Sequence, residues 1–299
     1  MRGSEKNSYK GDFMRWREGR RSENVEDIRD EGGPRRGPVG IKLGGGTILV
    51  ILVASLLLGQ NPLQILDMLN TGVSMAPQQP RSRPAENDET ADFVSVILGS
   101  TEDVWGAMFS SAGQTYPAPK LVLFSDEIES ACGMNSSATG PFYCPGDRKV
   151  YLDLSFLNEL QRLGASGDFA VAYVIAHEIG HHIQNLTGTE RKLRQLQSRA
   201  SSQEEVNALS VLMELQADCY AGLWAKHADT QRPILEQGDI EEGLNAAAAI
   251  GDDRLQRMAG RRVNPDGFTH GSSAQRVQWF RTGLQTGDLD ACDTFGKVR

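Results

Sequence analysis

Three of the five histidines in this 299-residue chain fall within six positions, at His177, His181 and His182. The segment HEIGH, residues 177–181, has the pattern HExxH. Residues i and i+4 of a helix stand one turn apart on the same face, so His177 and His181 can both bind one tetrahedral Zn²⁺. Glu178 is then placed to take a proton from metal-bound water and to return it to the leaving amine. His182 projects to another side of the helix, and we expect it to be a hydrogen-bonded structural residue.

The segment around this motif, residues 169–186, predicts a helix with Asp168 as its N-cap and Gly188 as its stop. Its N-terminal half is apolar on all sides, which is typical of a central, buried helix. A polar patch on an ordinary helix is the alternative, but burying imidazoles and a carboxylate here is costly without a metal or partners. Gly180 lowers helix propensity and therefore indicates a close approach of another segment.

The third metal ligand is expected from residues 203–228, which predict a long helix. Glu214 and Asp218 lie one turn apart on it, so Glu214 can bind zinc while Asp218 holds the outer N–H of a ligating histidine. A solvated charge pair is the alternative, although apolar residues flank both carboxylates. Three protein ligands leave the fourth position open, as in catalytic zinc sites.

Residues 43–59, LGGGTILVILVASLLLG, carry no charge and predict a transmembrane signal anchor. A cleaved signal peptide is disfavoured because 42 polar residues precede the run, and a buried core helix remains an alternative. Lys and Arg precede this run, and none follows it until Arg81. The positive-inside rule therefore predicts residues 1–42 in the cytoplasm and residues 60–299 outside it.

The net charge of −8 is unevenly distributed along the chain. Residues 1–42 have a net charge of +3 and little hydrophobic periodicity, which predicts a disordered basic tail. The remainder has a net charge of −11, which argues against a nucleic-acid partner. Residues 60–88 predict a Pro-containing linker, and residues 89–299 one zinc metallopeptidase domain. The mean hydropathy of −0.39 would exclude a membrane protein, but an average conceals one span.

All four cysteines, Cys132, Cys144, Cys219 and Cys292, follow the predicted anchor. An even count in an exported domain favours disulfides, of which three pairings are possible. We favour the local pair Cys132–Cys144, which leaves Cys219–Cys292. A four-thiolate zinc site is disfavoured because the spacing contains no CxxC pair.

Two short strands are predicted before the catalytic helix, at residues 121–125 and 149–154. We expect residues 149–154 to form the sheet edge that pairs with an extended substrate, with an interior strand as the alternative. The fold class that follows is a helix-rich α+β domain with a small β-sheet, preceded by one transmembrane helix.

HEIGHH and the later ELQADCYAG resemble a family of bacterial neutral zinc metallopeptidases. The resemblance extends to RW…RRSENVEDIRD, GPFYCPGDRKVYLDL and HGSSAQRVQWF, and so to nearly the whole chain. It implies a zincin-like fold, with His177, His181 and a downstream glutamate as ligands, at a bacterial inner membrane.

The Glu-x-x-Ala-Asp element also resembles the glutamate helix of membrane prenyl-protease-type gluzincins, although those enzymes have several spans. By that likeness, His270 would stabilise the oxyanion of the tetrahedral intermediate and Arg276 would orient the metal-ligand carboxylates. The alternative is a capped surface loop, with Ser272 or Ser273 as the cap, that carries a solvated histidine and arginine.

The sequence as a whole predicts a single-pass, membrane-anchored, zinc-dependent peptidase that cleaves peptide or protein substrates outside the cytoplasm. Two alternatives remain: a non-catalytic, zinc-stabilised envelope binding or scaffold protein, and an amidase acting on cell-wall peptide. Glu178 favours an enzyme because a purely structural site has no use for a buried base there. The oligomeric state stays open.

Overall fold

The computed structural model of the protein describes residues 14–29, 88–136 and 140–296. These residues belong to one of two compact units; the other, Gly32–Pro80, contains the predicted anchor at 43–59 and lies outside the described residues. The predicted linker also lies outside them, apart from residue 88. Within the described ranges, no helix combines the length and the apolar character that crossing a membrane requires.

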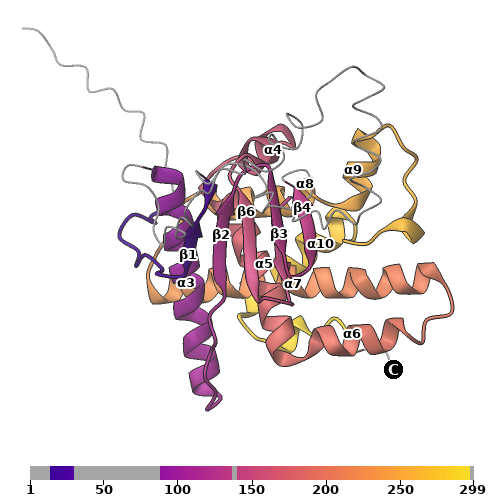
Figure 1. Ribbon diagram of the computed structural model, residues 1–299, viewed down its shortest axis with the longest axis horizontal. Coiled ribbons are helices and arrows are strands. Elements are labelled where there is room, and N and C mark those ends of the chain that lie inside the picture. Colours follow the sequence, from indigo (N-terminus) through magenta and orange to yellow (C-terminus); the bar gives the residue numbers. More distant parts are fainter. Residues whose placement is uncertain (1–13, 30–87, 137–139, 297–299) are drawn as a thin grey trace, which may run out of the picture. The chain divides into compact units, whose positions relative to one another are not determined.

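A four-stranded sheet forms one layer of the described unit (Figure 1). Its order is β1 (Val25–Asp27), β2 (Lys120–Phe124), β6 (Lys149–Asp153) and β5 (Phe142–Cys144). The first three strands run parallel, and β5 is antiparallel to β6. The expectation that residues 149–154 form an edge is wrong, because β5 pairs with β6 on the side away from β2. The edge strand next to the helix that carries HExxH, residues 168–187, is β5.

The N-terminal segment, residues 14–29, is part of the fold. Trp16 is buried and packs edge-on against Phe93, with ring centroids 5.2 Å apart. Arg21 donates two hydrogen bonds, of 2.9 and 2.7 Å, to the carboxylate of Asp92. The prediction of a disordered tail is therefore wrong for residues 14–29. Their arginines pair with carboxylates, and their apolar side chains pack against core residues, that lie far away in the sequence.

Helices cover one face of the sheet, and a hairpin covers the other. Leu121, Leu123, Val150 and Leu152 belong to the main core with the helices. Val122, Phe124 and Tyr151 form a smaller cluster with residues that include Ile128 of the hairpin. The hairpin is β3 (Glu127–Ser130) with β4 (Gly133–Ser136). The side chains of β2 and β6 alternate between the two faces of the sheet and therefore contribute to two apolar layers.

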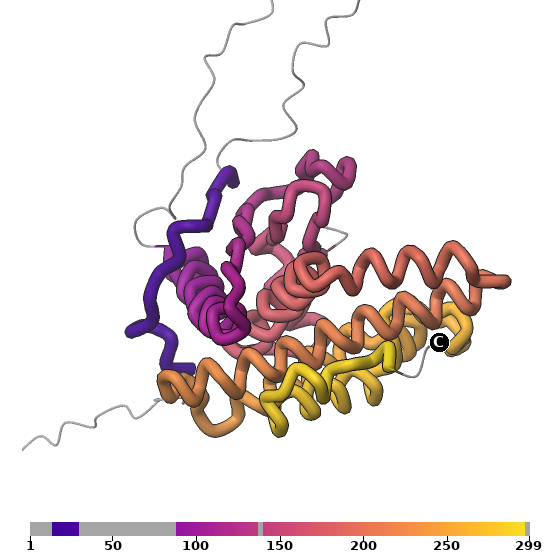
Figure 2. The backbone as a smooth tube through the Cα atoms, turned by 90° about the horizontal axis from the view of Figure 1, so that it is seen from below, coloured from indigo at the N-terminus to yellow at the C-terminus, as the bar shows by residue number. Residues whose placement is uncertain are grey.

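The helices are α3 (Glu89–Ser111), α4 (Phe156–Arg162), α5 (Asp168–Thr187), α6 (Thr189–Gln197), α7 (Gln203–Gln231), α8 (Asp239–Ala249), α9 (Asp252–Met258) and α10 (Ser273–Thr286), with short 3₁₀ turns η3 (Pro265–Gly267) and η4 (Asp290–Cys292). The long helix α7 contacts α5 and α6 on one side and α10 on the other (Figure 2). A Cβ atom on Gly283 of α10 would lie 1.9 Å from the Cys219 carbonyl oxygen, so only glycine permits this crossing.

Both favoured cysteine pairs form disulfides. Cys132–Cys144 connects the β3–β4 turn to the edge strand β5, and Cys219–Cys292 connects α7 to η4. The prediction of two disulfides, with this pairing, is confirmed.

Candidate metal centre

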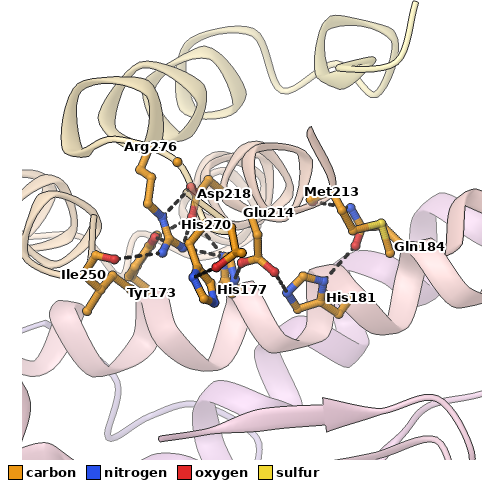
Figure 3. A network of polar contacts seen from close by, with 12 residues as sticks. Tyr173, His177, His181, Gln184, Met213, Glu214, Asp218, Ile250, His270 and Arg276 are labelled. Atoms are coloured by element: carbon orange, nitrogen blue, oxygen red, sulfur yellow. Dashed lines mark hydrogen bonds and ion pairs between the residues drawn. The ribbon is translucent and has the colours of Figure 1, made fainter. Parts of the chain in front are cut away.

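The three predicted metal ligands lie together between α5 and α7 (Figure 3). His177 Nε2 is 3.2 Å from Glu214 Oε2, and His181 Nε2 is 3.5 Å from Glu214 Oε1. The three ligand atoms all lie within 4.8 Å of one another. Tetrahedral zinc, with bonds of about 2.0–2.1 Å, separates its ligand atoms by about 3.3 Å. The donor set therefore fits Zn²⁺ in both chemistry and spacing.

The close approach of α5 and α7 depends on Gly180. A Cβ atom at this position would lie 3.0 Å from Ala217 Cα, on the facing helix. Gly188 ends α5 in the left-handed conformation, with φ of 83°, as the sequence predicts. Asp168 is the first residue of α5, and Gly167, not Asp168, occupies the N-cap position.

Asp218 lies behind His177, as the sequence predicts. Its fully buried carboxylate accepts a hydrogen bond of 2.9 Å from His177 Nδ1. Arg276 donates to both oxygens of Asp218, at 2.9 Å each. Burial would raise the pKa of Asp218, but the charge of Arg276 and the bond from His177 hold it below its usual range. Asp218 is thus a carboxylate that orients one imidazole and is itself held by one guanidinium.

The ligands carry charges that suit a bound cation. Burial would lower the pKa of His177, yet hydrogen bonds to Asp218 and Glu214 raise it to about 9. Burial would raise the pKa of Glu214, but the charge of His181 and bonds from both histidines lower it well below its usual value. In the metal-free protein, the carboxylates therefore favour protons on the histidines, and the histidines favour ionised carboxylates. A divalent cation would displace those protons.

Glu178 lies in a cleft of about 1140 Å³ beside the ligands. Its side chain is buried, and burial raises its pKa, an effect that the charges of His181 and His177 partly offset. The cleft is lined on its other sides by residues of the β5 strand, α4, α9 and the loop before α10, including Phe142, Tyr143, Phe156, Leu255 and His270.

His270 lines the same cleft from the loop before α10 (Figure 3). Asp252 Oδ2 accepts the main-chain N–H groups of Thr269, His270 and Gly271, at 2.8, 2.6 and 3.0 Å. A hydrogen bond to the same carboxylate raises the pKa of His270. The loop is therefore fixed, although the His270 side chain is 52% exposed.

The serine cap predicted before α10 is present. Ser272 accepts from the N–H of Gln275, whose side chain in turn accepts the Ser272 N–H, which makes a capping box. This box begins the helix that carries Arg276, whose side chain is buried and contacts Asp218 and Tyr173. Arg276 thus orients Asp218 rather than the ligand Glu214.

Two other histidines have structural partners. His182 is fully buried, its Nε2–H donates to the Pro117 carbonyl at 2.8 Å, and its Nδ1 accepts from the Tyr143 hydroxyl at 3.0 Å. Burial lowers its pKa to about 4. The structural role predicted for His182 agrees with these contacts. His227 is half-buried and donates from Nε2 to the Gly287 carbonyl at 2.8 Å, which connects α7 to the end of α10.

Sequence reasoning missed three residues near the ligands. The Tyr173 hydroxyl donates to Asp218, Gln184 accepts from His181, and Asp252 holds the His270 loop. Tyr173 stands one turn before His177 and Gln184 one turn after His181, so helical spacing was a usable signal for both. Asp252 gave no such signal, because it lies 18 positions from His270.

The similarity to known proteins extends over nearly the whole chain. A family model described as "putative neutral zinc metallopeptidase" matches residues 14–295. The chain is 51% identical over 288 residues to the uncharacterized protein YpfJ of Escherichia coli K12, which covers 95% of this chain and 99% of that protein. It is 41% identical over 255 residues to the uncharacterized proteins Mb2605 of Mycobacterium bovis and Rv2575 of Mycobacterium tuberculosis, with 81% of this chain and 85% of each relative covered. No solved structure matches the chain.

The matched region includes the N-terminal segment, both helices of the candidate metal centre and η4. Because the family model spans all of these elements, the chain belongs to this family of zinc metallopeptidases.

Proposed function

We propose that the protein is a zinc-dependent peptidase that hydrolyses peptide bonds outside the cytoplasm. The observation that carries the proposal is the grouping of His177, His181 and Glu214 in an open cleft with Glu178 beside them. A closed structural site would need a fourth protein ligand and no neighbouring base.

When bound by these three residues, zinc would polarise the scissile carbonyl and lower the pKa of water. Glu178 accepts the proton of the attacking water and returns it to the leaving amine. Burial, which raises the pKa of Glu178, brings this carboxyl closer to the range in which it can do both. His270, held by Asp252, donates a hydrogen bond to the oxygen that becomes negative.

The substrate backbone would pair with the edge of β5 on which no strand of the described residues lies. Phe142 and Tyr143 of this strand line the cleft, and the opposite edge of the strand is paired with β6. An extended peptide added to an open edge gains main-chain hydrogen bonds without regard to its sequence. The Cys132–Cys144 disulfide fixes the end of this strand.

Both disulfides support a location for this domain outside the cytoplasm, because structural disulfides persist in oxidising compartments. We propose the bacterial inner membrane, which the apolar residues 43–59 would contact.

The test compares wild type with Glu178→Gln on a panel of unfolded proteins, peptides and muropeptides. We expect wild type to cleave peptides or proteins, and Glu178→Gln to retain zinc while losing cleavage. Cleavage of muropeptides alone would favour the cell-wall amidase. A zinc-loaded wild type that cleaves nothing on the panel would refute the proposal and favour the scaffold.

A further inference from the structure

The two histidine ligands are held by different chemistry. His177 donates from Nδ1 to the buried carboxylate of Asp218. His181 donates from Nδ1 to a neutral group, the side-chain oxygen of Gln184, at 2.8 Å. Gln184 is fully buried on α5, one turn after His181.

The orientation of the Gln184 amide follows from its other contacts. Its Nε2 lies 2.7 Å from the main-chain carbonyl of Met213 and 3.1 Å from the side-chain oxygen of Gln216. A carbonyl oxygen can only accept, so the NH₂ group must face Met213 and the amide oxygen must face His181. Nδ1 of His181 then carries a hydrogen in either protonation state, and Nε2, which faces Glu214 and the metal position, is the nitrogen that would offer its lone pair to a bound metal (Figure 3).

Gln216 continues the same pattern away from the metal. It is buried, and its Nε2 donates to the carbonyl of Cys292 at 3.0 Å. This carbonyl also only accepts, so the Gln216 oxygen must face Gln184. η4, which contains Cys292, is held against α7 by the Cys219–Cys292 disulfide and by a hydrogen bond of 2.6 Å from Thr294 to the Leu212 carbonyl.

We propose that Gln184 and Gln216 are positioning residues that set the tautomer of His181 as a zinc ligand. The main-chain carbonyls of Met213 and Cys292 fix the direction of both amides. Through these contacts, η4 would influence the metal site without touching it. This inference rests on the proposed zinc site, but it does not require peptidase activity.

The test measures zinc affinity of the full-length protein by competition with a chelator. Gln184→Met preserves length while removing both hydrogen-bonding groups, and we expect the zinc Kd to rise about 10–100-fold. Gln216→Met leaves the bond to Met213 intact, and we expect a smaller rise. Cobalt-loaded protein should show a changed visible spectrum in Gln184→Met, which a loss of packing alone would not produce.

Gln197→Met is the matched control. Gln197 lies on α6 and donates from its amide to Val206 and Ser210 of α7, away from the ligands. A Gln184→Met protein with a zinc Kd within twofold of wild type would overturn the proposal, as would an equal rise in Gln197→Met. If Gln184→Met does not fold, Gln216→Met is the deciding variant. An unchanged zinc Kd in Gln216→Met then overturns the proposal. A wild type that binds no zinc overturns the proposed function as well.

Discussion

Replacing Arg276 by methionine should destabilise the metal-free protein by about 3 kcal/mol. The guanidinium is buried and donates two bonds of 2.9 Å to Asp218, which is itself fully buried. Methionine occupies similar space but leaves Asp218 without its guanidinium partner. Breaking a buried pair in this way costs about 3–5 kcal/mol. We take the lower end because His177, with a pKa of about 9, keeps a positive charge beside Asp218 at neutral pH.

The loss of stability in Arg276→Met should depend on pH. In wild type, the lowered pKa of Asp218 contributes stability above the ordinary value of 3.8, and this contribution is lost as pH falls toward the folded-state pKa. In Arg276→Met, burial raises the pKa of Asp218, so the variant regains stability as pH falls and the carboxyl takes up a proton. The difference between the two proteins is therefore largest near neutral pH and smaller near pH 4.

The assay is chemical denaturation of both metal-free proteins at neutral and acidic pH. Arg276→Lys keeps the charge without the two-bond geometry, so its free energy of unfolding should lie between those of wild type and Arg276→Met. Arg281→Met is the control, because Arg281 is an exposed residue of the same helix. A loss below about 1 kcal/mol, or an equal loss in Arg281→Met, would refute the reasoning.

Three further results are expected from equilibrium unfolding. Trp16→Ala should cost about 3–5 kcal/mol because the ring is buried against Phe93, whereas a disordered tail would show no loss. The folded-state pKa of His182 is about 4, below the unfolded value near 6.5, so the free energy of unfolding of wild type should fall by up to about 1.4 kcal/mol for each unit that the pH is lowered between these values. An equal slope in His182→Gln would contradict this. Replacing both Cys219 and Cys292 by alanine should cost about 4 kcal/mol, because the disulfide closes a loop of 73 positions; a loss below about 1 kcal/mol would contradict the loop-entropy estimate.

The grouping of the candidate metal ligands could be predicted from the sequence because most of their geometry is local. Helical spacing alone places His177 beside His181 and Glu214 beside Asp218. The one step that is not local, the contact between α5 and α7, left a signal in Gly180, because glycine in a helix indicates close packing. The disulfide pairing followed from the short distance between Cys132 and Cys144 along the chain.

The features that sequence reasoning missed depend on contacts between distant segments. Arg21 lies in a segment whose composition is that of a solvated tail. Its partner, Asp92, is 71 positions later in the chain, so the sequence near Arg21 does not reveal the contact. The order of β5 and β6 in the sheet has no local signature, so the edge strand could not be identified from alternation. Helical spacing places Gln184 near His181, but the direction of its amide depends on the Met213 carbonyl, which lies on another helix.

The pairing of β1 with β2 determines which parts of the chain share a compartment. β1 precedes the apolar residues 43–59 and β2 follows them, yet the two strands lie side by side in one sheet. A polypeptide that crosses a bilayer once leaves the sequence before the crossing and the sequence after it in different aqueous phases. Two strands that pair in one sheet lie in the same aqueous phase. The orientation predicted from the positive charges requires a chain in which β1 has left the sheet and β2 has become its exposed edge.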